Sequence, residues 1–104
     1  MADLQRIVDD LAARLGRPLL LEDRSQRVVA YSEQNGPMDD IRRDSILRRR
    51  TTPEVREWLR AAGVHEAHGP LRTPGAPRLG LKPRVCVPVR HEAELLGFLW
   101  FIDE

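Results

Sequence analysis

Two histidines are the residues best spaced for metal chemistry. His65 and His68 lie three positions apart, and Cys86 and His91 could complete a four-ligand set such as a zinc site. The histidine pair lies beside Gly69-Pro70, in a segment expected to be a loop, and no second closely spaced pair accompanies it. We therefore expect a polar loop here, with no metal and no other cofactor.

Nucleophilic side chains are also present, but none lies in a catalytic motif. Cys86 could be a reactive thiol, because Arg84 and Arg90 lie on its side of the strand predicted around it. No helix N-terminus is adjacent in sequence, so a buried and inert cysteine is favoured. The serines lack the Gly-x-Ser-x-Gly pattern, and the glycines lack the Lys-Ser/Thr ending of a phosphate-binding loop. The sequence therefore indicates a protein that is not an enzyme.

Arginines are concentrated on two helices predicted in the middle of the chain. Joined by Thr51-Thr52, these helices resemble a helix-turn-helix with the last hairpin as a wing, which would bind DNA. Acidic residues are interleaved with the arginines, and a winged helix would not normally carry an earlier hairpin before its helix pair. We expect a solvated, salt-bridged surface, with a winged-helix domain as an alternative. The arginines are Arg42, Arg43, Arg48, Arg49, Arg50, Arg56 and Arg60.

The composition is that of one small domain. The chain has 104 residues, a net charge of +1 and 32% charged residues, so no charge excess attracts nucleic acid or membrane. The single cysteine excludes an intramolecular disulfide and fits a reducing compartment. With no apolar amino-terminal segment, we expect a cytoplasmic protein. The sequence stops directly after a predicted strand, which suggests either a part of a longer protein or a very short natural chain.

The closing stretch predicts a β-hairpin. Val85, Val87 and Val89 alternate, as in a half-buried strand, and a short polar tip at 91–94 separates them from a second run at 95–102. The second run is apolar on both sides, which is typical of a central strand covered above and below. One side carries Leu95, Leu99 and Phe101; the other carries Leu96, Phe98, Trp100 and Ile102.

The rest of the chain predicts helices around a second hairpin. An amphipathic helix is expected from Asp3 to Leu15, ended by Gly16, followed by strands at 19–21 and 28–32. After the break at Asn35-Gly36-Pro37, two further helices are expected, at about 38–49 and from Pro53 onwards, with Thr52 as N-cap. A long loop at 64–83 holds a short edge strand at 71–73. The apolar residues expected on the first of these two helices are Met38, Ile41, Ile46 and Leu47. This order predicts an α+β fold with an antiparallel sheet flanked by helices.

Three segments carry a resemblance to a known family. They are residues 27–32, residues 42–49, and the closing hairpin with Leu96-Gly97-Phe98. Together they resemble the amino-terminal sensory region of actinobacterial PucR/CdaR-type transcriptional regulators, a GAF-like domain, over residues 1–104. The resemblance implies a GAF/PAS-like sheet and a sensory rather than a catalytic role, usually in a homodimer. It also implies that DNA is bound only through a separate helix-turn-helix domain that this chain lacks.

The resemblance also implies the place of a ligand site. GAF geometry puts a pocket for a small-molecule effector between the sheet and the middle helices, roofed by the long loop. The effector itself is not implied. An alternative is a pure dimerisation scaffold without a ligand. The expected lining residues are Tyr31, Ser45, Trp58, Arg84 and Cys86.

A dimer interface is expected on the amino-terminal helix and the neighbouring side of the sheet. The two middle helices are expected to cover the opposite side. One helix alone would then leave part of the Phe98 and Trp100 side open to a partner. The expected interface residues are Leu4, Ile7, Val8, Leu11, Leu15, Phe98 and Trp100.

Overall fold

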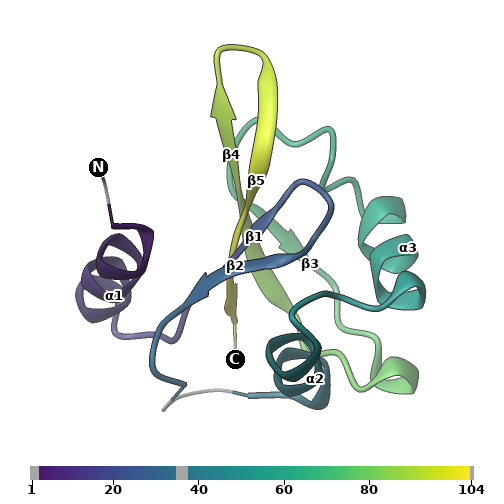
Figure 1. Cartoon of the computed structure of the whole chain (residues 1–104). Coiled ribbons are helices and arrows are strands. Elements are labelled where there is room, and N and C mark those ends of the chain that lie inside the picture. Colours follow the sequence, from purple (N-terminus) through teal and green to yellow (C-terminus); the bar gives the residue numbers. More distant parts are fainter. Residues whose placement is uncertain (1–2, 35–37, 104) are drawn as a thin grey trace.

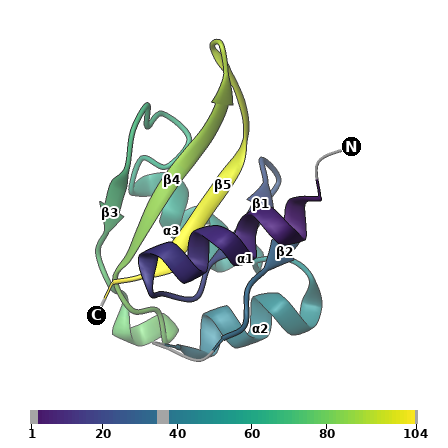
Figure 2. The same ribbon diagram turned by 90° about the vertical axis from the view of Figure 1, so that its left-hand side faces the viewer.

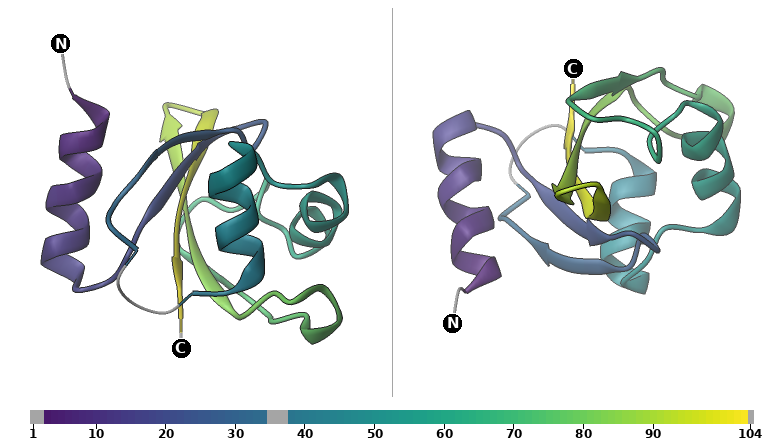
Figure 3. Two further views of the ribbon diagram at one scale, coloured as in Figure 1. Left: turned by 60° about the horizontal axis from the view of Figure 1, so that its bottom comes forward. Right: turned by 90° about the horizontal axis from the view of Figure 1, so that it is seen from above.

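The computed structural model describes residues 3–34 and 38–103 and shows a sheet between two helical layers (Figures 1 and 3). The break predicted at Asn35-Gly36-Pro37 lies outside the described residues. The elements are α1 (Leu4–Leu15), β1 (Leu20–Asp23), β2 (Val28–Tyr31), α2 (Asp40–Arg48), α3 (Pro53–Ala61), β3 (Leu71–Thr73), the 3-10 helix η1 (Pro77–Leu79), β4 (Arg84–His91) and β5 (Glu94–Ile102).

The five strands form one antiparallel sheet in the order β2-β1-β5-β4-β3. In the middle of the sheet, Leu99 of β5 lies between Leu21 of β1 and Val87 of β4. Leu71–Thr73 is an edge strand. The predicted α+β fold is confirmed, as is the central position of the last strand. With helices on both faces, the arrangement is GAF/PAS-like rather than a winged helix.

Helix α1 covers one face of the sheet. Asp3 caps it by accepting from the backbone N–H groups of Gln5 and Arg6, and Gly16 ends it in the left-handed region at φ 66°. The buried Val8 of α1 packs with Leu19 and other apolar side chains from β1, β2 and β5. Figure 2 shows α1 crossing the lower part of this face, while the upper ends of β4 and β5 have no helix in front of them.

The opposite face carries the main core, beneath α2 and α3. Phe98 and Trp100 are buried there with Val55 and Leu59 of α3. The expectation that α1 covers these residues, and leaves them partly open, is therefore wrong. Alternation shows which side chains share a face of a strand, but it does not show which helix covers that face.

Helix α2 presents polar side chains to the sheet. Arg42 and Ser45 are its buried residues, whereas Leu47 is 77% exposed. The predicted apolar stripe is therefore wrong for Leu47; Ile41 and Ile46 pack against the core only in part. Two α2 ion pairs, Arg43–Asp40 and Arg48–Asp44, lie on the salt-bridged surface that was expected. Arg42 was expected on the same surface but is fully buried, so that expectation is wrong for it.

The connection between α2 and α3 is fixed to the β1–β2 turn. Arg49 ends α2 with φ 63°, and its carbonyl accepts from Val28 N at 2.9 Å. Thr51 N donates to the carbonyl of Gln26 at 3.0 Å. Thr52 stands at the N-cap of α3, as predicted, but its side chain makes no capping hydrogen bond. Both helices are thus held at one end by backbone hydrogen bonds to the hairpin.

Candidate functional site

Buried polar side chains gather between the sheet and α2 and α3. Polar groups buried in a core normally need partners, because each unpaired one costs free energy. We call this group the polar cluster. Its members lie on β1, β4 and α2, at the N-cap of α2, and between α2 and α3. They are Glu22, Asp39, Arg42, Ser45, Thr51 and Arg84, none more than 7% exposed.

Glu22 forms the acidic side of the polar cluster. Its Oε2 accepts from Thr51 Oγ1 at 2.6 Å and its Oε1 from Gln26 Nε2 at 3.5 Å; Ser45 Oγ lies 3.5 Å from Thr51 Oγ1. In the described part of the chain, no cationic group lies within ion-pair distance of its carboxylate. Burial raises the pKa of Glu22, and the hydrogen bond from Thr51 opposes this only in part.

Asp39 and Arg84 form a buried ion pair that joins α2 to β4. The Asp39 carboxylate caps α2 by accepting from Arg42 N at 2.7 Å, and it also accepts from Lys82 N at 2.8 Å. Nη2 of Arg84 donates to the same carboxylate. A carboxylate with donors from three residues stabilises both the start of α2 and the charge of Arg84.

Arg42 is a buried cation without an ion pair. Its Nη1 donates to Gln34 Oε1 at 2.9 Å and its Nη2 to the carbonyl of Trp100 at 3.4 Å, but its Nε has no partner. None of the described carboxylates lies within ion-pair distance. Burial, with help from nearby Arg84, lowers the pKa of Arg42 to about 10, so the guanidinium remains charged at neutral pH.

A small cavity of about 10 Å³ lies within the polar cluster. This volume holds about one water molecule. The indole N–H of Trp100, which lines the cavity, has no hydrogen-bond partner, although it lies close enough to Glu22 to lower its pKa. The lining consists of Glu22, Ser45, Thr51, Arg84 and Trp100 with Leu20, Ile41, Val55 and Leu59.

Two of the five predicted lining residues, Ser45 and Arg84, meet at this cavity. Cys86 is fully buried in the adjoining core, where burial raises the pKa of its thiol to about 12, as expected of an inert cysteine. The guanidinium carbon of Arg49 lies over the ring of Tyr31, 6.0 Å from the ring centre. Trp58 lines a different depression, of about 460 Å³, between α3 and η1.

Sequence reasoning missed Glu22, Arg42, Asp39 and Thr51. Two of them left a signal. Glu22 lies two residues after Leu20 and so shares its inward face, where a carboxylate is out of place. Arg42 lies on a helix whose apolar stripe was already incomplete, which indicates that a polar residue takes the inward position.

The histidines lie away from the polar cluster. His65 packs edge-on against Phe98 with ring centres 5.4 Å apart, and burial lowers its pKa. Among the described residues, no group of three His, Cys, Asp or Glu side chains lies close enough to hold a metal ion.

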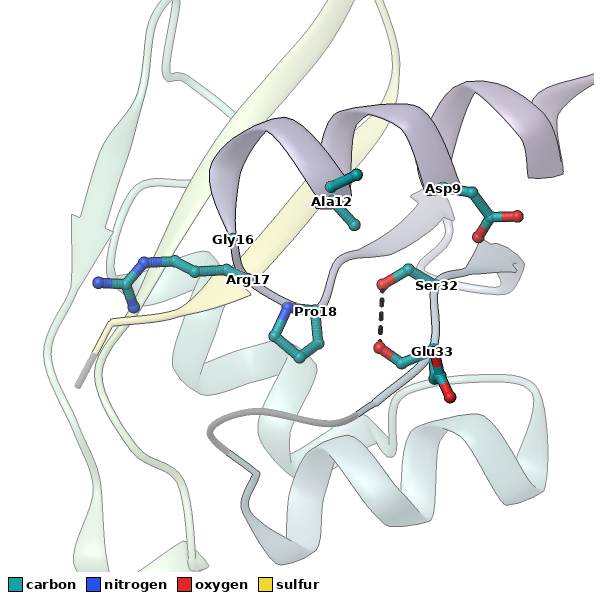
Figure 4. A pocket seen from close by; sticks show the side chains of 8 residues that line it. Asp9, Ala12, Gly16, Arg17, Pro18, Ser32 and Glu33 are labelled. Atoms are coloured by element: carbon teal, nitrogen blue, oxygen red, sulfur yellow. Dashed lines mark hydrogen bonds between the residues drawn. The ribbon is translucent and has the colours of Figure 1, made fainter.

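A second pocket, of about 520 Å³, lies at the C-terminal end of α1 (Figure 4). Asp9 and Arg17 border it, but its buried polar group, Ser32 Oγ, already accepts from Leu19 N at 2.8 Å and lies 3.4 Å from the Glu33 carbonyl. With no unpaired buried polar atom in its lining, this pocket is a weaker ligand site than the polar cluster.

Comparison with known proteins points to transcription regulation. No family model matches the chain. It is 27% identical, over 96% of its length, to the DNA-binding transcriptional activator AdeR of Bacillus subtilis. It is 23% identical, over 95% of its length, to the proline-responsive transcriptional activator PutR of the same organism. The chain is related to transcriptional activators. It spans about a quarter of the length of each of these relatives.

These relatives are regulators rather than enzymes, which supports a regulatory role for the chain. Within the residues described, no helix is long and apolar enough to cross a lipid bilayer.

Proposed function

We propose that the chain is the cytoplasmic sensory domain of a PucR/CdaR-type transcriptional regulator, and that a small-molecule effector binds in the polar cluster. One observation carries this proposal: Glu22 and Arg42 are buried beside an unpaired Trp100 N–H, without ion partners. An apolar core of the same volume would be at least as stable. Perturbed, under-satisfied polar groups are instead characteristic of functional sites.

The relatives support the two parts of this role. PutR is described as responsive to proline, and AdeR as DNA-binding. The present chain corresponds to about a quarter of each, so we assign effector binding to it and DNA binding to a domain outside these 104 residues.

A metabolite library tests effector binding through thermal unfolding. At least one class of small polar compound should raise the melting temperature, because a ligand that binds only the folded state stabilises it. Ser45→Met fills the cavity and should abolish this rise. Ser25→Met, on the exposed β1–β2 turn, is the matched control and should retain it. A library without any stabilising compound, or a rise that survives in Ser45→Met, would contradict a site in the polar cluster.

A second role, homodimerisation through α1, is favoured by the surface of that helix. Val8 is buried against the sheet, but four other apolar side chains of α1 remain in contact with water. Apolar side chains exposed on one helix are of the kind that binds a partner. They are Leu4, Ile7, Leu11 and Leu15, between 36% and 50% exposed. The proposed surface does not include Val8, Phe98 or Trp100, which were expected at the interface but are at most 2% exposed.

Leu11→Asp is expected to weaken the homodimer at least about 10-fold in Kd, because it places a charge in an apolar contact. Sedimentation of both chains over a range of concentrations measures the change. Leu47→Asp is the matched control, since Leu47 is the most exposed large apolar side chain among the described residues and lies on α2. An unaltered chain that stays monomeric at tens of micromolar would rule out this interface.

A further inference from the structure

Glu22 and Arg42 act on each other's charge across the polar cluster, but neither makes an ion-pair contact, and they differ in the partner that each requires. Glu22 has a hydroxyl and an amide as hydrogen-bond donors but no cation. Arg42 Nε and the indole N–H of Trp100 are donors without acceptors. A ligand that completes the cluster would therefore supply a cationic donor to Glu22 and at least one anionic acceptor to the unpaired N–H groups.

We propose that the effector is a small zwitterion with one ammonium and one carboxylate group, as in a free α-amino acid. This inference rests on the proposed function, and names the ligand class of the same site. The ammonium group lies at Glu22, within reach of the hydroxyls of Ser45 and Thr51. The carboxylate takes the indole N–H of Trp100 and lies toward Arg84, which lines the cavity; Arg42 does not line it and acts on the carboxylate through its charge.

Charge balance favours a zwitterion over other small molecules. The Asp39–Arg84 pair is already neutral. An inorganic anion would compensate Arg42 but leave Glu22 without a cation, and a simple amine would do the reverse. A neutral sugar would compensate neither. Because buried charges are stable only when paired and hydrogen-bonded, the compound that supplies both partners gains the most.

The cavity must widen to admit such a molecule, since about 10 Å³ holds one water. The wall opposite the sheet consists of Ile41, Val55 and Leu59, which are side chains of α2 and α3. Within the described residues, no backbone–backbone hydrogen bond joins either helix to the sheet; the backbone ties are at Arg49 and Thr51, between the helices. Outward movement of the helices therefore loosens side-chain contacts with the sheet, including the Asp39–Arg84 pair and the bond from Arg42 to the carbonyl of Trp100. The apolar wall favours a ligand with a small, uncharged side chain.

A groove on the surface shares Asp39 with the polar cluster. It has a volume of about 600 Å³ and is bordered by Met38, Asp39, Leu81 and Pro83. Asp39 borders this groove and also holds Arg84 inside the core. Asp40 and Lys82 also border the groove, so a zwitterion that arrives through it meets groups of both signs before it reaches the pair of Asp39 and Arg84.

Ligands that lack one of the two charged groups test the roles of the ammonium and the carboxylate separately. The common protein amino acids are screened with the full chain by thermal unfolding, and L-proline is titrated beside L-prolinamide and cyclopentanecarboxylate. The amide lacks the carboxylate, and the acid lacks the nitrogen. A free amino acid should raise the melting temperature by about 5 °C or more at saturation, and its two analogues should not.

Glu22→Gln should weaken amino-acid binding at least about 10-fold, because it removes the charge that pairs with the ammonium group. The variant is expected to fold, since glutamine keeps an acceptor for Thr51 and removes a buried charge. Glu57→Gln, on the exposed side of α3, is the control and should bind normally. If Glu22→Gln does not fold, the ligand series on the unaltered chain decides alone.

Three outcomes would overturn the inference. The first is an analogue that binds as well as the amino acid. The second is a different compound class that stabilises the chain in a Ser45-dependent way while no amino acid does; the proposed function would then stand. The third is a complete absence of Ser45-dependent stabilisation, which would remove the proposed function too.

Discussion

Asp39→Ala should destabilise the chain by about 3–5 kcal/mol, the usual cost of removing one partner from a buried ion pair. The substitution leaves the guanidinium of Arg84 in the core without its carboxylate. It also removes the N-cap of α2, which alone is worth about 1 kcal/mol. Unfolding in urea, followed by circular dichroism, measures the loss.

Asp40→Ala provides the control at the next residue. Its carboxylate is exposed and pairs with the exposed Arg43, so its loss should cost less than about 1 kcal/mol. Asp39→Asn should fall between the two, because it keeps an acceptor for the cap but not the charge. Equal stabilities of the two alanine variants would show that the Asp39–Arg84 pair does not hold α2 on the sheet.

Gly97→Ala should cost about 3 kcal/mol, which corresponds to a fall in melting temperature of about 12–24 °C in a domain of this size. A Cβ atom on Gly97 would lie 2.2 Å from the carbonyl oxygen of Glu22 and 3.2 Å from Cα of Asp23. These are backbone atoms of β1, so the clash is relieved only if β1 and β5 separate. Glu22 would then move away from Thr51.

Gly69→Ala is the matched substitution, because nothing lies within 4 Å of its Cβ position. It should melt within a few degrees of the unaltered chain. A similar melting temperature for Gly97→Ala would mean that β1 and β5 are not as closely paired as the structure shows.

Most of the fold could be predicted because local rules coincide with the final packing. Some features depend only on residues that are close in the sequence. They are the Asp3 cap and the Gly16 end of α1, and the alternation of Val85, Val87 and Val89. The helix that covers each face depends on contacts between distant segments, which is why Phe98 and Trp100 were assigned to the wrong layer.

The site was predicted less well, for a related reason. Ser45 and Arg84 followed from the GAF-like geometry, but Glu22 and Arg42 violate the pattern that sequence reasoning relies on. An arginine on a helix is normally a surface residue. It becomes an inward residue here because Gln34 Oε1 and the carbonyl of Trp100 accept hydrogen bonds from its guanidinium, and those contacts exist only after folding.

The position of β5 has a consequence for how the chain folds. The β1–β2 hairpin and the β3–β4 pair can each form from neighbouring segments, but only β5 joins them. Its pairing with β1, such as Leu21 with Leu99, closes a loop that contains most of the chain. Such long-range closure is entropically costly and slows folding compared with local pairing. The docking of β5 is therefore the step that turns two partial sheets into one cooperative unit, and it brings Glu22 and Arg84 into the same core.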